Sequence, residues 1–116
     1  MNRTADVIII GGGCAGLTAA LYCARASLVT VVFANDLQDK GGLLVKTSIV
    51  ENYPGFPEGI LGFDLVENME KQAMRHGATI IDKKVDRVDL KGDVKLIFDE
   101  NGVEYTSKAV IVATGS

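Results

Sequence analysis

The sequence predicts an α/β fold with a Rossmann-like βαβ unit in three layers, together with a small antiparallel β-meander. Four consecutive β-branched apolar residues, Val7–Ile10, are followed at once by a glycine-rich turn and a helical segment that extends to about Ala26. A second β-branched run, Leu28–Phe33, completes the βαβ unit, and its two strands are expected to be parallel. A further apolar run comes last, at Lys108–Ala113. Continuous β-branched runs indicate strands that are buried on both faces of a parallel sheet.

The composition is that of a globular chain and excludes several classes of partner. The 116 residues, 47% of them hydrophobic and 23% charged, suffice for one domain or a part of one. Twelve basic and 15 acidic residues give a net charge of −3 without a basic cluster. We therefore expect neither a nucleic acid nor an anionic membrane as a partner. The longest apolar run, Leu28–Ala34, is far too short to span a bilayer.

The first residues and the cysteines indicate a reducing, cytoplasmic location. Met1–Ala5 lead straight into a strand, without the apolar segment of a secretory signal. Cys14 and Cys23 lie on one predicted helix, too far apart along its axis to form a disulfide. Neither the cysteines nor the single histidine, His76, have the spacing of metal ligands, so no metal site is expected.

The glycine-rich turn carries the strongest local functional pattern. Its glycines match the fingerprint G-x-G-x-x-G between a strand and a helix, which is typical of dinucleotide binding. The first glycine is expected to make a tight turn, the second to let the backbone approach a pyrophosphate, and the third to let helix pack on strand. The helix N-terminus offers N–H groups to the phosphates. The alternative is a purely structural glycine turn. The predicted site consists of Gly11, Gly12, Gly13, Cys14, Ala15 and Gly16.

The position that usually holds the adenosine ribose is ambiguous. Dinucleotide folds place an acidic residue near the end of the second strand, but here that strand runs into Ala34 and Asn35. Asp36 either contacts the ribose from the loop or is a solvated aspartate in a turn.

Residues 35–62 are predicted to form a long irregular loop. They contain seven glycines and prolines, and loops of this length inside a compact domain are usually functional. The loop is also rich in apolar residues, so we expect it to pack either against a bound planar ligand or over the edge of the sheet.

A second helix is predicted over Asp64–His76, with Asp64 as its N-cap and Gly77 as its C-terminal stop. His76 is expected to face solvent in the last turn. The buried face of this helix is predicted from residues at four-residue spacing: Leu65, Met69 and Ala73.

A strand at Thr79–Ile81 leads into a meander. Apolar residues alternate from Val85 to Tyr105, with turn sequences at Lys91–Asp93 and Asn101–Gly102. This pattern predicts three short antiparallel strands with one solvated face, to which we assign no chemistry.

Three segments in order match the pattern of a known family: the glycine turn, the segment GGLLVKTSIVENYPGFPEGI at Gly41–Ile60 and the terminal ATGS. In these segments the chain resembles the low-molecular-weight thioredoxin reductases. The resemblance covers essentially all 116 residues and corresponds to the N-terminal part of the FAD domain. The Gly41–Ile60 segment is its most specific part. The NADPH domain and the C-terminal FAD segment of the family are expected to be absent from this chain, which would then be an incomplete FAD domain.

The resemblance implies a role for each matching position. The Gly11–Gly16 turn would hold the FAD pyrophosphate, and Val85 would contact the adenine side. Residues along the ribityl chain and the flavin ring would be Gly42, Leu43, Thr47 and Asn52. Residues that close over the cofactor after the last strand would be Ala113, Thr114 and Gly115.

The resemblance also implies partners. Members of the family are homodimers that take hydride from NADPH and reduce a Cys-x-x-Cys disulfide, with thioredoxin or a similar disulfide protein as the acceptor. This chain has no Cys-x-x-Cys and no second glycine fingerprint. No catalytic residue is therefore expected in it, and it is not expected to catalyse the family reaction alone.

Departures from the family pattern keep other functions open. Cys14 replaces a common proline and is either a reactive thiol at the helix N-terminus or a small packing residue. Leu43 replaces a glutamine that could hydrogen-bond the flavin. One alternative is a non-catalytic dinucleotide- or nucleotide-binding module, or a partner-binding lobe with an open edge near Val110–Ala113. Another is a related flavoprotein with a different electron acceptor.

Overall fold

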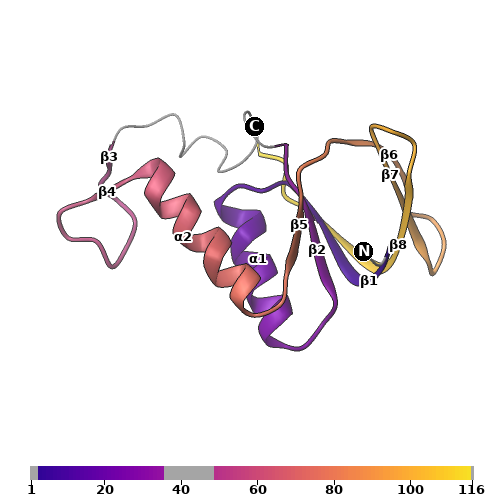
Figure 1. The fold of residues 1–116 in the computed structure, drawn as a ribbon, viewed down its shortest axis with the longest axis horizontal. Helices are drawn as coiled ribbons and strands as arrows, with labels where there is room; N and C mark the ends of the chain where they lie inside the picture. The colour runs from indigo at the N-terminus through magenta and orange to yellow at the C-terminus, as the bar shows by residue number, and fades with distance from the viewer. Residues whose placement is uncertain (1–2, 36–48, 116) are drawn as a thin grey trace.

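The computed structural model describes residues 3–35 and 49–115 (Figure 1). The described ranges contain two helices and eight strands. In chain order they are β1 (Thr4–Ile10), α1 (Cys14–Arg25), β2 (Thr30–Phe33), β3 (Ile49–Val50), β4 (Ile60–Leu61), α2 (Gly62–Arg75), β5 (Thr79–Ile81), β6 (Val85–Asp89), β7 (Lys95–Asp99) and β8 (Glu104–Val112).

A mixed sheet organises these elements, in the strand order β5-β2-β1-β8-β7-β6. The pairs β1–β2, β1–β8 and β2–β5 are parallel, and β6–β7 and β7–β8 are antiparallel. Figure 1 shows α1 and α2 on one side of the parallel strands and the β6–β7 hairpin at the opposite end of the molecule. This arrangement confirms the predicted α/β fold with its βαβ unit and its meander.

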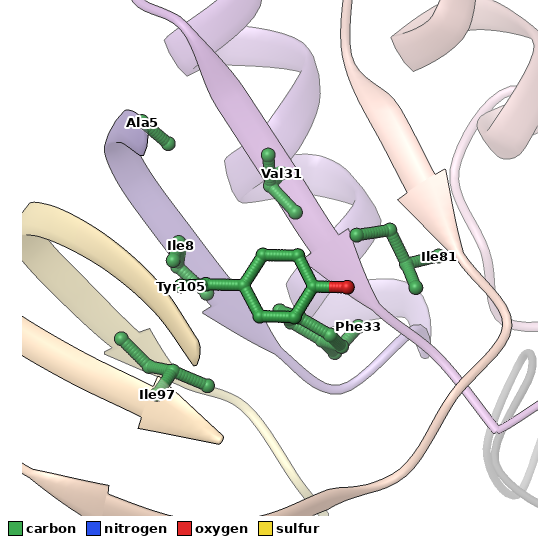
Figure 2. Packing of buried hydrophobic residues seen from close by; sticks show 7 residues of the cluster. All are labelled: Ala5, Ile8, Val31, Phe33, Ile81, Ile97 and Tyr105. Atoms are coloured by element: carbon green, nitrogen blue, oxygen red, sulfur yellow. The ribbon is translucent and has the colours of Figure 1, made fainter. Parts of the chain in front are cut away.

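The consecutive β-branched residues of β1 serve two cores, because neighbouring side chains on a strand point to opposite faces. Val7 and Ile9 pack on the helix side with Ala20 and Ala24 of α1. Ile8 points to the other face, where a second core lies under the meander (Figure 2). The residues of that second core are Ala5, Ile8, Val31, Phe33, Ile81, Ile97 and Tyr105. Both faces of β1 are therefore covered, as its sequence predicts.

The last strand differs from the expectation in extent and in burial. Instead of one strand ending near Tyr105 and a second at Lys108–Ala113, β8 is continuous. Its first half pairs with β7 and its second half with β1. The predicted burial of the second half is wrong, since Val112 is 63% exposed. The physical reason is the pairing of the strand: in the described chain, β7 accompanies β8 only as far as Ser107, so the second half of β8 has a neighbouring strand on one side alone.

Other boundaries also differ. The first strand begins at Thr4 rather than Val7, and β2 begins at Thr30 rather than Leu28. Just before β2, the Val29 N–H donates to the Asp6 carboxylate (2.7 Å). The predicted N-cap Asp64 is wrong, since α2 begins at Gly62 with Leu61 as its N-cap. Asp64 instead lies in the first turn, where its charge favours the helix dipole.

Two further features of α2 and its surroundings bear on the predictions. Gly77 has a φ of 109° just after α2, which confirms it as the stop, and the predicted face Leu65, Met69 and Ala73 is buried. Within the loop predicted at 35–62, β3 and β4 form a short antiparallel hairpin, which the sequence analysis missed.

A buried carboxylate ties the meander together. Asp99 is 1% exposed; its Oδ1 accepts hydrogen bonds from the backbone N–H groups of Asn101 and Val103, and its Oδ2 from the Tyr105 hydroxyl (3.3 Å). Burial alone would raise the pKa of Asp99, but these hydrogen bonds and the charge of Lys83 outweigh it and lower the pKa. Burial and the Asp99 carboxylate raise the pKa of Tyr105, whose ring packs edge-on against Phe33.

We predict that the meander loses stability in acid through Asp99. Because its folded-state pKa is lowered, Asp99 stabilises the fold fully above its unfolded-state pKa of about 4, and this contribution disappears as the pH falls through the folded-state value. Asp99→Asn should lower the free energy of unfolding by about 1–3 kcal/mol at neutral pH. It should also flatten the dependence on pH, measured by urea unfolding from neutral to acidic pH.

The matched control is Glu100→Gln, an exposed neighbour of Asp99, which should change the free energy of unfolding by no more than about 0.5 kcal/mol. An unchanged acid dependence in Asp99→Asn would contradict this account of the meander.

Candidate functional site

The turn between β1 and α1 lies at the carboxyl ends of parallel strands. The Gly11 N–H donates to the Phe33 carbonyl at the end of β2 (2.9 Å). The Ala113 N–H, just after β8, donates to the Ile10 carbonyl (2.8 Å). In open α/β sheets, ligands bind outside these carboxyl ends, so the turn occupies the expected place for a ligand site.

Two glycines of the turn are required by close backbone packing. Gly11 has a φ of 119°, and a Cβ built on it would lie 2.0 Å from the Ala113 carbonyl oxygen. A Cβ on Gly16 would lie 1.9 Å from the Gly11 carbonyl oxygen and 3.4 Å from Ile9 Cγ2. The first glycine therefore makes the turn and the third lets α1 lie directly on β1, which are the mechanical roles that the fingerprint predicts.

The N-terminus of α1 has the features that favour an anion at a helix terminus. Its N-cap is Gly13, without a side-chain hydrogen bond, and its first turn contains no acidic residue. The first intrahelical bond there runs from the Leu17 N–H to the Gly13 carbonyl (2.9 Å). The N–H groups of the preceding helical residues have no acceptor within the helix. These donors and the helix dipole suit a phosphate, so the turn fits the pyrophosphate of a dinucleotide.

Cys14, the first residue of α1, is tied to the loop and to α2. Its Sγ lies 3.5 Å from Sδ of Met69. Burial raises the pKa of Cys14, and a hydrogen bond with Tyr53 lowers it only in part. The thiol is therefore held in its protonated form, which supports a packing role over a reactive one. Both cysteines are free, as predicted.

The apolar loop packs against the helices. Val50 belongs to a cluster of buried residues that otherwise come from α1 and α2. Tyr53 and Phe56 are partly buried and pack against this cluster. The cluster consists of Leu17, Val50, Leu65, Val66 and Met69. Ile80 of β5, the edge strand of the sheet, packs against the same cluster, which agrees with the expectation that the loop covers the sheet edge. Packing of the loop against a bound planar ligand stays a prediction. The contacts of Tyr53 and Met69 with Cys14 were not anticipated, although Met69 was predicted to lie on the buried face of its helix.

The remaining predicted site residues are distributed over several elements. Asn52 is exposed between β3 and β4. Val85 begins β6 and packs against the core around Tyr105. Thr114 and Gly115 follow Ala113 at the end of β8, next to the glycine turn. Gly42, Leu43 and Thr47 lie outside the described residues.

The ribose position is also only partly described. Ala34, at the end of β2, is 4% exposed and its N–H donates to the Ile81 carbonyl (2.9 Å). Its side chain has no group that could hydrogen-bond a ribose. Asn35 is half-buried, and Asp36 lies outside the described residues.

Metal-binding groups and membrane-spanning helices are absent from the described ranges 3–35 and 49–115. They contain no group of three or more histidine, cysteine, aspartate or glutamate side chains arranged to hold a metal ion. No helix in them has the length and apolar character needed to cross a membrane.

Comparisons with known proteins agree with this geometry. The family model of the pyridine nucleotide-disulphide oxidoreductases matches residues 5–116. A thioredoxin reductase of Streptomyces clavuligerus is 53% identical over 116 residues, which cover 100% of this chain and 36% of the relative. The bifunctional thioredoxin reductase/thioredoxin of Mycobacterium leprae is 46% identical over 111 residues, 96% of this chain and 24% of the relative.

Solved structures give the same result. The thioredoxin reductase of Gloeobacter violaceus superposes with a TM-score of 0.92 at 37% identity, over 100% of this chain and 38% of that one. The thioredoxin reductase of Lactococcus lactis superposes with a TM-score of 0.87 at 37% identity, over 96% of this chain and 35% of that one. The chain thus spans between about a quarter and two fifths of the length of the proteins it matches.

We predict that Gly16→Ala destabilises the fold although alanine is the better helix former. The added methyl group must displace the Gly11 backbone, so the free energy of unfolding should fall by at least about 2 kcal/mol in urea denaturation. Gly92→Ala is the control, because a Cβ there would come no closer than 3.5 Å to the Val94 carbonyl oxygen. Equal effects of the two substitutions would contradict the close packing at the turn.

Proposed function

Because the chain belongs to the pyridine nucleotide-disulphide oxidoreductase family, we propose that it forms part of the FAD-binding domain of a thioredoxin reductase-like flavoprotein. The observation that carries the proposal is the N-terminus of α1, which has neither a side-chain cap nor an acidic first turn. It stands beside two glycines whose backbones pack too closely for any side chain. This combination supports an anionic ligand at the turn, and the pyrophosphate of FAD meets that requirement.

In this proposal, Gly11–Gly16 hold the pyrophosphate and the segment Ala113–Gly115 closes over it. Val85 contacts the adenine side, while Gly42, Leu43, Thr47 and Asn52 line the ribityl chain and the flavin ring. Bound FAD would supply the transfer of electrons between a nicotinamide and a disulfide. The residues of this chain bind and orient it, mainly through backbone groups, and none of them is assigned a catalytic role.

The partners of the whole protein are part of the proposal. NADPH would be the electron donor, and thioredoxin or a similar disulfide protein the acceptor, in a cytoplasmic homodimer. The support is the similarity to thioredoxin reductases of which this chain spans about a third. No residue of this chain is assigned to the binding of the nicotinamide or of the acceptor.

A second candidate is a non-catalytic dinucleotide-binding module or a partner-binding lobe. The observation that favours it is the end of β2, where the buried Ala34 replaces the ribose-binding carboxylate. The exposed second half of β8, with Val112 63% exposed, offers a surface for another polypeptide. This candidate shares the glycine turn with the first candidate, but its bound nucleotide would take no part in electron transfer.

We predict that a negative charge at the N-cap of α1 weakens FAD binding. Gly13→Asp and Gly13→Asn both place a good capping side chain at a backbone that is already extended (φ −81°, ψ −169°). The two side chains have nearly the same shape, so a difference between them reports charge. Titration followed by flavin fluorescence should show at least about tenfold weaker FAD binding by Gly13→Asp than by Gly13→Asn, because the carboxylate repels the pyrophosphate.

Thermal unfolding of the two variants provides the control for folding, since both caps should preserve the helix. Equal FAD affinities of the two variants, or no FAD binding by the unsubstituted chain, would contradict the proposed site.

A further inference from the structure

The turn between β7 and β8 contains the dipeptide Asn101–Gly102, and both residues are exposed. Of the five asparagines of the chain, only Asn101 precedes a glycine. Glycine has no side chain to shield its backbone nitrogen, and asparagine is among the residues that are chemically labile in proteins. The turn therefore places a side-chain amide next to an unhindered backbone nitrogen at the surface.

We propose that Asn101 is a site of spontaneous deamidation, and that the buried carboxylate of Asp99 controls the rate by holding the turn closed. The inference goes beyond the proposed function and does not depend on FAD, because this turn belongs to the meander and not to the glycine turn at the start of α1.

The reaction needs only the chain itself and water. The backbone nitrogen of Gly102 loses its proton to solvent and attacks Cγ of Asn101. The new N–Cγ bond closes a succinimide ring, and the bond from Cγ to Nδ2 breaks with release of ammonia. Water then opens the ring. Attack at Cγ leaves aspartate, whereas attack at the backbone carbonyl carbon leaves isoaspartate, whose main chain runs through the former side chain. No group is oxidised or reduced.

Hydrogen bonds to Asp99 restrain the reacting nitrogen. The Gly102 N–H donates to the Asp99 carbonyl (2.9 Å), and the Asp99 N–H donates to the Val103 carbonyl (3.0 Å). Asp99 Oδ1 accepts from the N–H groups on either side of Gly102, those of Asn101 (2.8 Å) and Val103 (3.0 Å). Attack on Cγ requires the Gly102 N–H to leave its acceptor, so the fraction of molecules with an open turn sets the rate.

The isoaspartate product is incompatible with this set of hydrogen bonds. It inserts one methylene group into the main chain between the Asn101 and Val103 nitrogens, which share Asp99 Oδ1 as their acceptor. It also adds a carboxylate two residues from the buried Asp99. Like charges and lost donors both oppose a charged, buried Asp99. The modification therefore weakens the contacts that restrain it.

Peptide mapping by mass spectrometry tests the site. After incubation of the folded chain in mildly alkaline buffer, the Asn101 peptide should show the mass gain of an amide converted to an acid. The internal controls are Asn52 and Asn68, which are also exposed but precede tyrosine and methionine. Asn101 should react at least about fivefold faster than either, because glycine leaves its nitrogen unshielded. Equal or slower reaction at Asn101 would overturn the site.

Variants of the carboxylate test its control of the rate. Asp99→Asn should deamidate at Asn101 at least about threefold faster than the unsubstituted chain, because weaker acceptors let the turn open more often. Tyr105→Phe, which removes only the hydroxyl bonded to Asp99 Oδ2 (3.3 Å), should also react faster. Glu100→Gln, the exposed matched control, should stay within about twofold of the unsubstituted rate.

Guanidinium chloride separates the turn from the local sequence. The unfolded chains of all these variants should react at one common rate, at least about tenfold above that of the folded unsubstituted chain. Equal rates in the folded and unfolded chain, or equal rates in folded Asp99→Asn and Glu100→Gln, would overturn the control by Asp99.

The effect of the inserted methylene is measured against Asn101→Asp, which carries the added charge on a normal main chain. The isoaspartate fraction of the aged chain, separated by ion exchange, should unfold at a lower urea concentration than this variant. Identical unfolding of the two would contradict the disruption of the turn by the longer main chain.

Discussion

The rest of the structure depends on the packing of three backbone segments at Gly11. The turn after β1, the first turn of α1 and the residues after β8 approach so closely there that side chains are excluded at Gly11 and Gly16. This packing fixes the start of α1 against the carboxyl ends of β1 and β8. The uncapped N–H groups of α1 are consequently directed to the place where open α/β sheets bind their ligands.

The sheet links this turn to the meander. Ile8 and Ile9 are both fully buried, on opposite faces of β1, so the helix layer and the meander layer stabilise the same strand. β8 connects the two parts by pairing with β7 at one end and with β1 at the other. The buried Asp99 and Tyr105 complete the meander side, where hydrogen bonds from Tyr105 and from two backbone N–H groups lower the pKa of Asp99.

Local patterns predicted much of this fold from the sequence. The β-branched run of β1, the glycine fingerprint, the buried face of α2 and the turns of the meander each reflect constraints within a few residues of one another. What could not be predicted depends on distant partners. The start of α2 at Gly62, the β3–β4 hairpin and the contact of Cys14 with Met69 arise from tertiary packing. The exposure of Val112 reflects which strands stand beside β8, and no pattern within that run reveals it. The glycine turn was predictable because its chemistry is local, whereas Val85 and Asn52 were assigned by resemblance and still await a test.

The most direct measurement of the central claim is the change in backbone amide chemical shifts when FAD is added to the isotope-labelled chain. If the α1 N-terminus cradles the pyrophosphate, the largest changes should occur at the amides of Cys14, Ala15 and Gly16, with smaller ones at Ala113–Gly115. The exposed edge strand β6 should change little beyond Val85. Largest changes on the outer face of α2 or in the β6–β7 hairpin, with an unaffected glycine turn, would contradict the account.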